Sequence, residues 1–186
     1  VEAVAEDAEA PEIFHRYPAI DDAIVAEIVG AAHFDLERVR ELVERRPELA
    51  RATWDWGFGD WETAIGAASH VGRRDIVDYL LSRGARPDIF SLAMMGAAAQ
   101  VRGVLAAFPE MASIDGPHGI SLLQHARLGL RDQVLSDEQR VAAQELVDHL
   151  ESLRGDAKPA YLEVAETEQD KFIGDYKYGD GEKDGF

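Results

Sequence analysis

Cysteine is absent from this 186-residue sequence, lysine is scarce, and no apolar run is long. Without cysteine the chain forms neither disulfides nor thiolate metal sites. All lysines lie at or beyond Lys158, so arginine supplies the positive charge elsewhere. No stretch approaches the roughly 18 apolar residues that a membrane-spanning helix needs. We therefore expect no membrane span.

The sequence also has few basic side chains for its many acidic ones. It carries 36 acidic and 19 basic residues, for a formal net charge of −17. Such a surface repels phosphate backbones, so we expect no nucleic-acid partner and consider a basic protein the more compatible one. Hydrophobic residues make up 46% of the chain, which is enough to build a folded core.

The usual motifs of catalytic and metal sites are missing as well. The sequence has no His-Glu-x-x-His pair and no Gly-x-Ser-x-Gly elbow. Residues 57–59 read Gly-Phe-Gly but lack the third glycine of a dinucleotide-binding loop. Residues 180–185 open like a calcium loop, but the chain ends before the closing glutamate. The sequence therefore predicts no cofactor, no metal and no catalytic residue.

Four histidines are candidates for another role, because we expect them near the inner face of the fold: His33, His70, His118 and His125. Asp115 is close to one of them in sequence. None of the four has paired ligand spacing, and no cysteine assists them. We interpret them as structural, capping helix ends or forming hydrogen bonds between repeats.

Internal repeats are the strongest positive signal. The segment Val-Arg-Glu-Leu-Val at 39–43 is followed by Pro-Glu-Leu-Ala at 47–50. The segment Val-Arg-Gly-Val-Leu at 101–105 is followed by Pro-Glu-Met-Ala at 109–112. Both parts are displaced by the same 62 positions (101 − 39 and 109 − 47). The displacement predicts two similar helix–loop units.

The clearest unit lies between them, at residues 60–85. It reads Thr-Ala-Ile-Gly-Ala-Ala-Ser-His-Val-Gly at 63–72, Asp-Ile-Val-Asp-Tyr-Leu-Leu at 75–81, and then Gly84-Ala85. A threonine that caps a helix, a turn glycine and a closing glycine are expected of a short helix pair. This unit resembles the ankyrin repeat, although Ala64 and Gly66 stand where that pattern has proline and histidine.

The resemblance implies an all-α, ankyrin-type helical-repeat solenoid of about four helix pairs, from Asp21 to Leu153. A fourth unit begins at Gly119, with Ser121 as its capping residue, and its second helix opens with a capping box at Ser136. We expect the apolar rows of the first three units to form one continuous core.

We divide the chain into an acidic N-terminal arm at 1–18, the ankyrin-repeat domain at 19–155 and a C-terminal extension at 156–186. The alternating Phe172, Gly174, Tyr176 and Tyr178 predict a short β-like segment. One hairpin is not stable alone. The segment therefore either packs on the last repeat or begins a β domain that continues beyond this chain.

The predicted function is a non-catalytic protein–protein interaction module that uses its concave face and a tryptophan-rich finger loop. All three tryptophans lie within residues 53–62. Tryptophans beside carboxylates suit a basic partner through burial and cation–π contact. The alternative role for these rings is to seal the junction between the first two units. The predicted partner-binding residues are Trp54, Asp55, Trp56, Phe58, Asp60, Trp61, Glu62 and His70.

A different class of function stays open at this point. The chain would then be a small-ligand-binding or hydrolase-associated protein whose catalytic part is a further C-terminal domain. The sequence begins at Val1 and is compatible with a cytoplasmic protein, or with an exported one from which an upstream signal has been removed.

Overall fold

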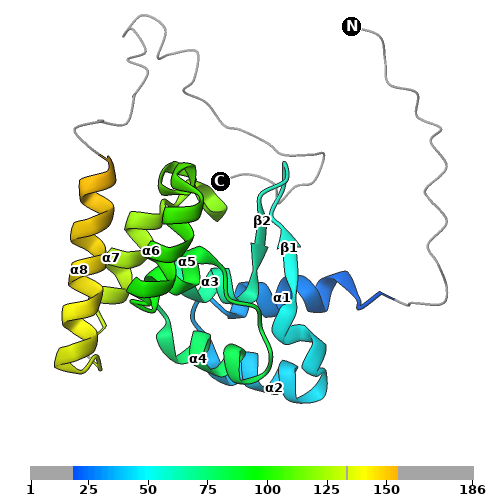
Figure 1. Ribbon diagram of the computed structural model, residues 1–186. Coiled ribbons are helices and arrows are strands. Elements are labelled where there is room, and N and C mark those ends of the chain that lie inside the picture. Colours follow the sequence, from blue (N-terminus) through cyan, green and yellow to red (C-terminus); the bar gives the residue numbers. More distant parts are fainter. Residues whose placement is uncertain (1–18, 133, 155–186) are drawn as a thin grey trace, which may run out of the picture. The chain divides into compact units, whose positions relative to one another are not determined.

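The computed structural model describes residues 19–132 and 134–154. The expected acidic arm, the β-like segment at 172–178 and the calcium-like loop at 180–185 lie outside these ranges. The described chain is predominantly helical, as the sequence predicts (Figure 1). Its α-helices are α1 (Asp22–Ala31), α2 (Leu36–Arg45), α3 (Ala64–His70), α4 (Arg74–Ser82), α5 (Ile89–Met94), α6 (Ala98–Ala107), α7 (Leu122–Leu130) and α8 (Asp137–Arg154).

The helices form four consecutive pairs, α1–α2, α3–α4, α5–α6 and α7–α8, with the two members of each pair in contact. The expected caps start several of them. Thr63 accepts a hydrogen bond from the Gly66 amide at 2.9 Å, and Ser136 and Gln139 form the predicted capping box. Gly72, in the turn between α3 and α4, has φ of 76°, a left-handed conformation that glycine adopts without strain.

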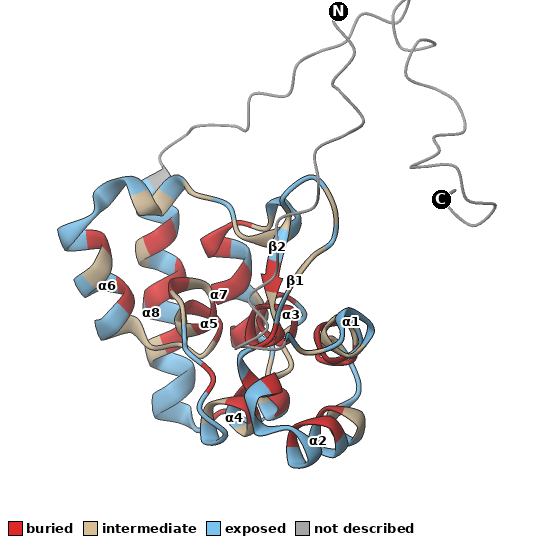
Figure 2. Cartoon of the chain, turned by 90° about the vertical axis from the view of Figure 1, so that its right-hand side faces the viewer, coloured by how far each residue is buried: buried red, intermediate tan, exposed pale blue. Residues whose placement is uncertain are grey.

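Contacts between pairs run mainly along the first helices. Helix α1 contacts α3, α3 contacts α5, and α5 contacts α7, while the second helices α2 and α4 also touch. Helix α3 is therefore enclosed by its neighbours and is buried along its whole length (Figure 2). Its small residues, such as Ala67 and Ala68, allow this close approach.

The core is divided into two clusters, which corrects the expectation of one continuous core. The rows from the first two pairs, including Val39 and Ile76, belong to one cluster. Val101 and Leu105 from the third pair belong to a second cluster with residues of α7 and α8. The division passes through α5, because Met94 packs in the first cluster and Ala93 in the second. In a stacked array each pair buries its apolar face against its neighbours only, so one cluster need not span the chain.

Two helical glycines differ in the space that surrounds them. A Cβ atom added at Gly129 of α7 would lie 1.7 Å from the carbonyl oxygen of Met94, so α7 meets the backbone of α5 directly. A Cβ added at Gly103 of α6 would meet no atom within 4 Å.

The connections between pairs differ in length. After the first pair comes the 3-10 segment η1 (Pro47–Arg51) and a two-stranded antiparallel hairpin of β1 (Thr53–Asp55) and β2 (Trp61–Thr63). The hairpin projects away from α2 and α4 (Figure 1). The third pair follows the second through a short connection without a hairpin, and Asp88 caps α5. The connection to the fourth pair contains η2 (Pro109–Ser113) and η3 (Pro117–Gly119).

In the part of the chain that the structure describes, no helix is both long and apolar enough to cross a membrane.

Candidate functional site

The hairpin divides its side chains between two faces. Trp54 pairs with Glu62, and Asp55 pairs with Trp61. Because side chains alternate along a strand and paired residues share a face, Trp54 and Glu62 lie on one face and Asp55 and Trp61 on the other. The sequence Thr-Trp-Asp before the glycines and Trp-Glu-Thr after them already contains this alternation. The predicted finger loop therefore contains two short strands that were not expected from its composition.

The turn of the hairpin is shaped by Asp55. Its carboxylate accepts hydrogen bonds from the amides of Gly57 and Gly59, at 2.9 and 3.1 Å. The turn exposes aromatic side chains, with Trp56 44%, Phe58 94% and Trp61 63% accessible. Trp54 differs from them because it is half-buried against the first core cluster. The sealing role therefore describes Trp54, while most of the Trp61 side chain is exposed.

Glu62 is fully buried, which is unusual for a carboxylate. One of its oxygens, Oε2, accepts a hydrogen bond of 2.8 Å from the indole Nε1 of Trp56. The other, Oε1, lies 2.8 Å from Nδ1 of His70, the last residue of α3. These two atoms are close but not aligned for a hydrogen bond, so both are buried without a hydrogen-bond partner.

Two more histidines face the same carboxylate. Nε2 of His33 and Nε2 of His118 each lie 3.5 Å from Oε2 of Glu62. His33 follows α1, and its Nδ1 lies 3.1 Å from the carbonyl oxygens of Val29 and Gly30, to which it donates. The imidazole rings are packed together, with centroids of His70 4.8 Å from His33 and 5.2 Å from His118. We call Glu62, His33, His70 and His118 the histidine–glutamate cluster.

Asp60 holds His118 in place. Its carboxylate accepts a hydrogen bond of 3.0 Å from the backbone amide of His118 and one of 2.7 Å from Nδ1 of the ring. The backbone of His118 has φ of 59°, an uncommon conformation for a residue with a side chain. The loop before α7 is thereby joined to the hairpin between the first two pairs.

Both carboxyl groups are held in the ionised form. The hydrogen bond from the His118 backbone, with that of the ring, lowers the pKa of Asp60 even though partial burial raises it. Burial on its own would raise the pKa of Glu62. The contacts with His70 and Trp56, and the charge that His70 and His33 carry when protonated, outweigh burial and lower that pKa.

The structure separates the predicted partner-binding residues into two groups. Trp56, Phe58 and Trp61 are exposed, and Asp55 and Asp60 are partly accessible. Glu62 is 0% and His70 is 9% exposed, so both lie beneath the predicted partner-binding surface. The negative rim expected around the tryptophans therefore lacks Glu62.

The histidines were expected near one face, but the meeting of three of them at one carboxylate was not predicted. A signal for two of them exists, because Gly-Ala-Ala-His at 30–33 resembles Gly-Ala-Ala-Ser-His at 66–70. Equivalent helix ends lie side by side in a stack, so these two rings meet. His118 comes from an irregular loop, whose position no periodicity predicts. His125 lies elsewhere, fully buried beside Phe90.

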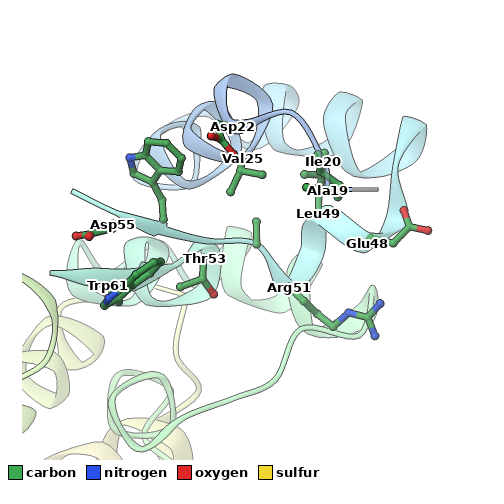
Figure 3. Close-up of a pocket in the computed structure, with 12 residues that line it drawn as sticks. Ala19, Ile20, Asp22, Val25, Glu48, Leu49, Arg51, Thr53, Asp55 and Trp61 are labelled. Atoms are coloured by element: carbon green, nitrogen blue, oxygen red, sulfur yellow. The ribbon is translucent and has the colours of Figure 1, made fainter. Parts of the chain in front are cut away.

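A surface groove runs beside the hairpin, with a volume of about 530 Å³ (Figure 3). Helix α1, the segment η1 and both strands contribute to its walls. Trp54 and Trp61 supply aromatic surface. The charged residues that line it are Asp22, Glu48, Asp55 and Arg51, which gives an excess of negative charge.

A comparison of the chain with protein-family models, with curated proteins and with solved structures finds no match.

Proposed function

We propose that this chain is a non-catalytic interaction module of the ankyrin-repeat type, which binds a protein partner through a basic segment. Four consecutive helix pairs, with first helices in contact along the row and a hairpin between the first two pairs, support the ankyrin-type assignment. Arrays of this kind present long surfaces made of loops and first helices, and each pair adds area to that surface.

The observation that carries the proposal is the exposure of Trp61 in the wall of an acidic groove. Large aromatic side chains are costly to leave in water and are enriched among residues that dominate binding energy. Trp61 is 63% exposed and also lines the groove. A lysine or arginine side chain placed there would contact an indole ring and a carboxylate of the groove wall.

The net charge of −17 adds a long-range attraction for a basic segment. Such attraction accelerates encounter and weakens as salt is added. Binding is therefore expected to be strongest at low ionic strength and to fall, without vanishing, at physiological salt, because the aromatic contacts do not depend on salt.

Selection from a displayed peptide library against the purified chain tests the proposal. Enriched peptides are expected to carry lysine or arginine, and their dissociation constants are then measured by calorimetry. Trp61→Ala is expected to weaken binding by about 2 kcal/mol, roughly 30-fold. Glu48→Gln is expected to weaken it less and to reduce its salt dependence.

Phe108→Ala is the matched control. Phe108 is 55% exposed and lies at the end of α6, outside the groove. Its replacement is expected to leave peptide affinity unchanged. Selection of neutral or acidic peptides, or equal affinities of Trp61→Ala and wild-type protein, would remove the proposal.

A further inference from the structure

We infer that His33, Glu62, His70 and His118 form a binding site for one divalent transition-metal ion of the first row, such as Zn²⁺. One ligand atom from each of the four residues can be chosen so that all lie within 4.8 Å of one another. This site goes beyond the proposed partner binding and depends on none of the groove residues. Four observations support it.

The first is the chemistry of the donors. Three imidazoles and one carboxylate suit Zn²⁺, Cu²⁺, Ni²⁺ or Fe²⁺, which bind nitrogen well. Ca²⁺ and Mg²⁺ prefer sites built from oxygen alone, and here only Glu62 supplies oxygen. Because the chain has no cysteine, no thiolate of its own competes with these four side chains for the ion.

The second is the spacing. Ligands bound to Zn²⁺ at about 2.0–2.1 Å in a tetrahedron are separated from one another by about 3.3 Å. Nε2 of His33 and Nε2 of His118 both lie 3.5 Å from Oε2 of Glu62. The contact of 2.8 Å between His70 and Oε1 of Glu62 is shorter. A small rotation of the carboxylate or the His70 ring would open it to the same distance.

The third is the orientation of the rings. Nδ1 of His33 donates its proton in hydrogen bonds to backbone carbonyls, and Nδ1 of His118 donates to the carboxylate of Asp60. In the neutral rings both Nε2 atoms therefore carry lone pairs, and each lies 3.5 Å from Oε2 of Glu62. A lone pair this close to a carboxylate repels it unless the ring takes up a proton or a cation lies between the two groups. A histidine that donates its second nitrogen to a carboxylate or carbonyl is also the usual arrangement around a bound metal.

The fourth is the combination of burial and access. Side chains of Glu62 and His70 are 0% and 7% exposed, and Oε1 of Glu62 and Nδ1 of His70 lack hydrogen-bond partners. Buried polar atoms without partners are costly, and a bound ion would satisfy both. Side chains of His33 and His118 are 21% and 34% exposed, which leaves a route from solvent to the cluster.

Metal titration of the full chain, without an affinity tag and after removal of metal by a chelator, tests the site. Co²⁺ is the probe, because its visible absorption reports coordination by nitrogen and oxygen in a low-symmetry site. We expect one Co²⁺ per chain, displaced by one Zn²⁺, and no displacement by millimolar Mg²⁺ or Ca²⁺. Failure of the folded chain to bind Co²⁺ or Zn²⁺ at this stoichiometry would overturn the inference. The cluster would then hold protons in place of an ion.

Single substitutions locate the bound ion. His33→Gln and His118→Gln are each expected to weaken Zn²⁺ binding by more than about 100-fold, beyond the effect typical of residues that only orient ligands. His149→Gln in α8 is the matched control and is expected to bind as wild type does. Retained affinity in both cluster variants, or equal loss in the control, would contradict the assignment.

Glu62→Gln is the most direct variant, but a buried position can affect folding. Circular dichroism of the metal-free protein separates the two effects. His118→Gln changes a partly exposed loop residue, so it keeps the test decisive if Glu62→Gln does not fold. Peptide binding measured on the same variants distinguishes this site from the groove, because Trp61→Ala is expected to leave Co²⁺ binding intact.

Discussion

Asp60 and His118 are 58 residues apart in sequence, yet one carboxylate binds both the backbone and the ring of the histidine. The backbone bond restrains the left-handed conformation of His118, and the ring bond directs Nε2 toward Glu62. A single aspartate of the hairpin thus determines the position of a loop that belongs to another part of the stack.

Asp60→Ala is expected to lower the free energy of unfolding by about 1 kcal/mol. The hydrogen bonds to this charged group would contribute more if they were buried, but both side chains are about one-third exposed and water screens them. Urea unfolding of the metal-free protein measures the change. Asp78→Ala, which removes an exposed carboxylate on α4, is the control and is expected to stay within about 0.5 kcal/mol of wild type.

Trp56→Phe removes the indole proton that Glu62 accepts while keeping an aromatic ring. Because the acceptor is a buried carboxylate, the loss is expected to cost about 2 kcal/mol of unfolding free energy. Trp61→Phe in the same hairpin is the control and is expected to cost under about 0.5 kcal/mol, since Trp61 is exposed. Similar losses in the two variants would show that the bond to Glu62 contributes nothing to stability.

Gly129→Ala and Gly103→Ala are expected to change the free energy of unfolding in opposite directions. The new methyl at 129 would overlap the carbonyl of Met94, so α5 and α7 must separate, at a cost of about 3 kcal/mol or more. The methyl at 103 meets open space inside a helix and is expected to stabilise the protein by about 0.5–1 kcal/mol. Thermal and urea unfolding of both variants measure the pair. A destabilised Gly103→Ala would mean that α6 is packed more closely than described.

Acid is expected to destabilise the protein partly through His125. Burial has the largest effect and lowers the pKa of this histidine, and the charge of His70 lowers that pKa further. The hydrogen bond to the Ser121 carbonyl and the charges of Asp88 and Glu62 act in the opposite direction and raise the pKa. The unfolded chain therefore takes up the proton first. The contribution of His125 to the free energy of unfolding is complete above about pH 6.5. It is lost as the pH falls toward the pKa of His125 in the folded protein, by up to about 1.4 kcal/mol per pH unit.

His125→Leu tests this dependence. Unfolding free energies between pH 7.5 and 5 are expected to decline less steeply in the variant than in wild type. His149→Gln is the control, with the slope of wild type. Parallel curves for His125→Leu and wild type would show that His125 does not contribute to the acid loss.

The helices were largely predictable from the sequence, and the division of the core was not. Local signals such as the caps at Thr63 and Ser136 act within a few residues, so their effect can be read from the chain. Whether Val101 packs with Ile76 or with Leu146 depends instead on how close neighbouring helices approach. That approach is decided by single contacts such as the one at Gly129.

The same distinction applies to the site. The tryptophan loop stood out by composition, and its exposure at Trp61 agrees with a surface role. Glu62 was placed on the rim because adjacent acidic residues look alike in sequence. Its burial follows from strand alternation, which turns Glu62 inward when Trp61 is outward. The meeting with His118 depends on an irregular loop and has no local signature.

The span of the histidine–glutamate cluster has a consequence for the order of folding. Most contacts in a stack of helix pairs join near neighbours in sequence and can form early. The cluster, by contrast, collects residues from position 33 to position 118, so it is complete only after three pairs and two loops have docked. Substitutions at Asp60 or His118 should therefore accelerate unfolding and leave the folding rate almost unchanged. The cluster would then set how long the native state persists, while the helix pairs set how fast it forms.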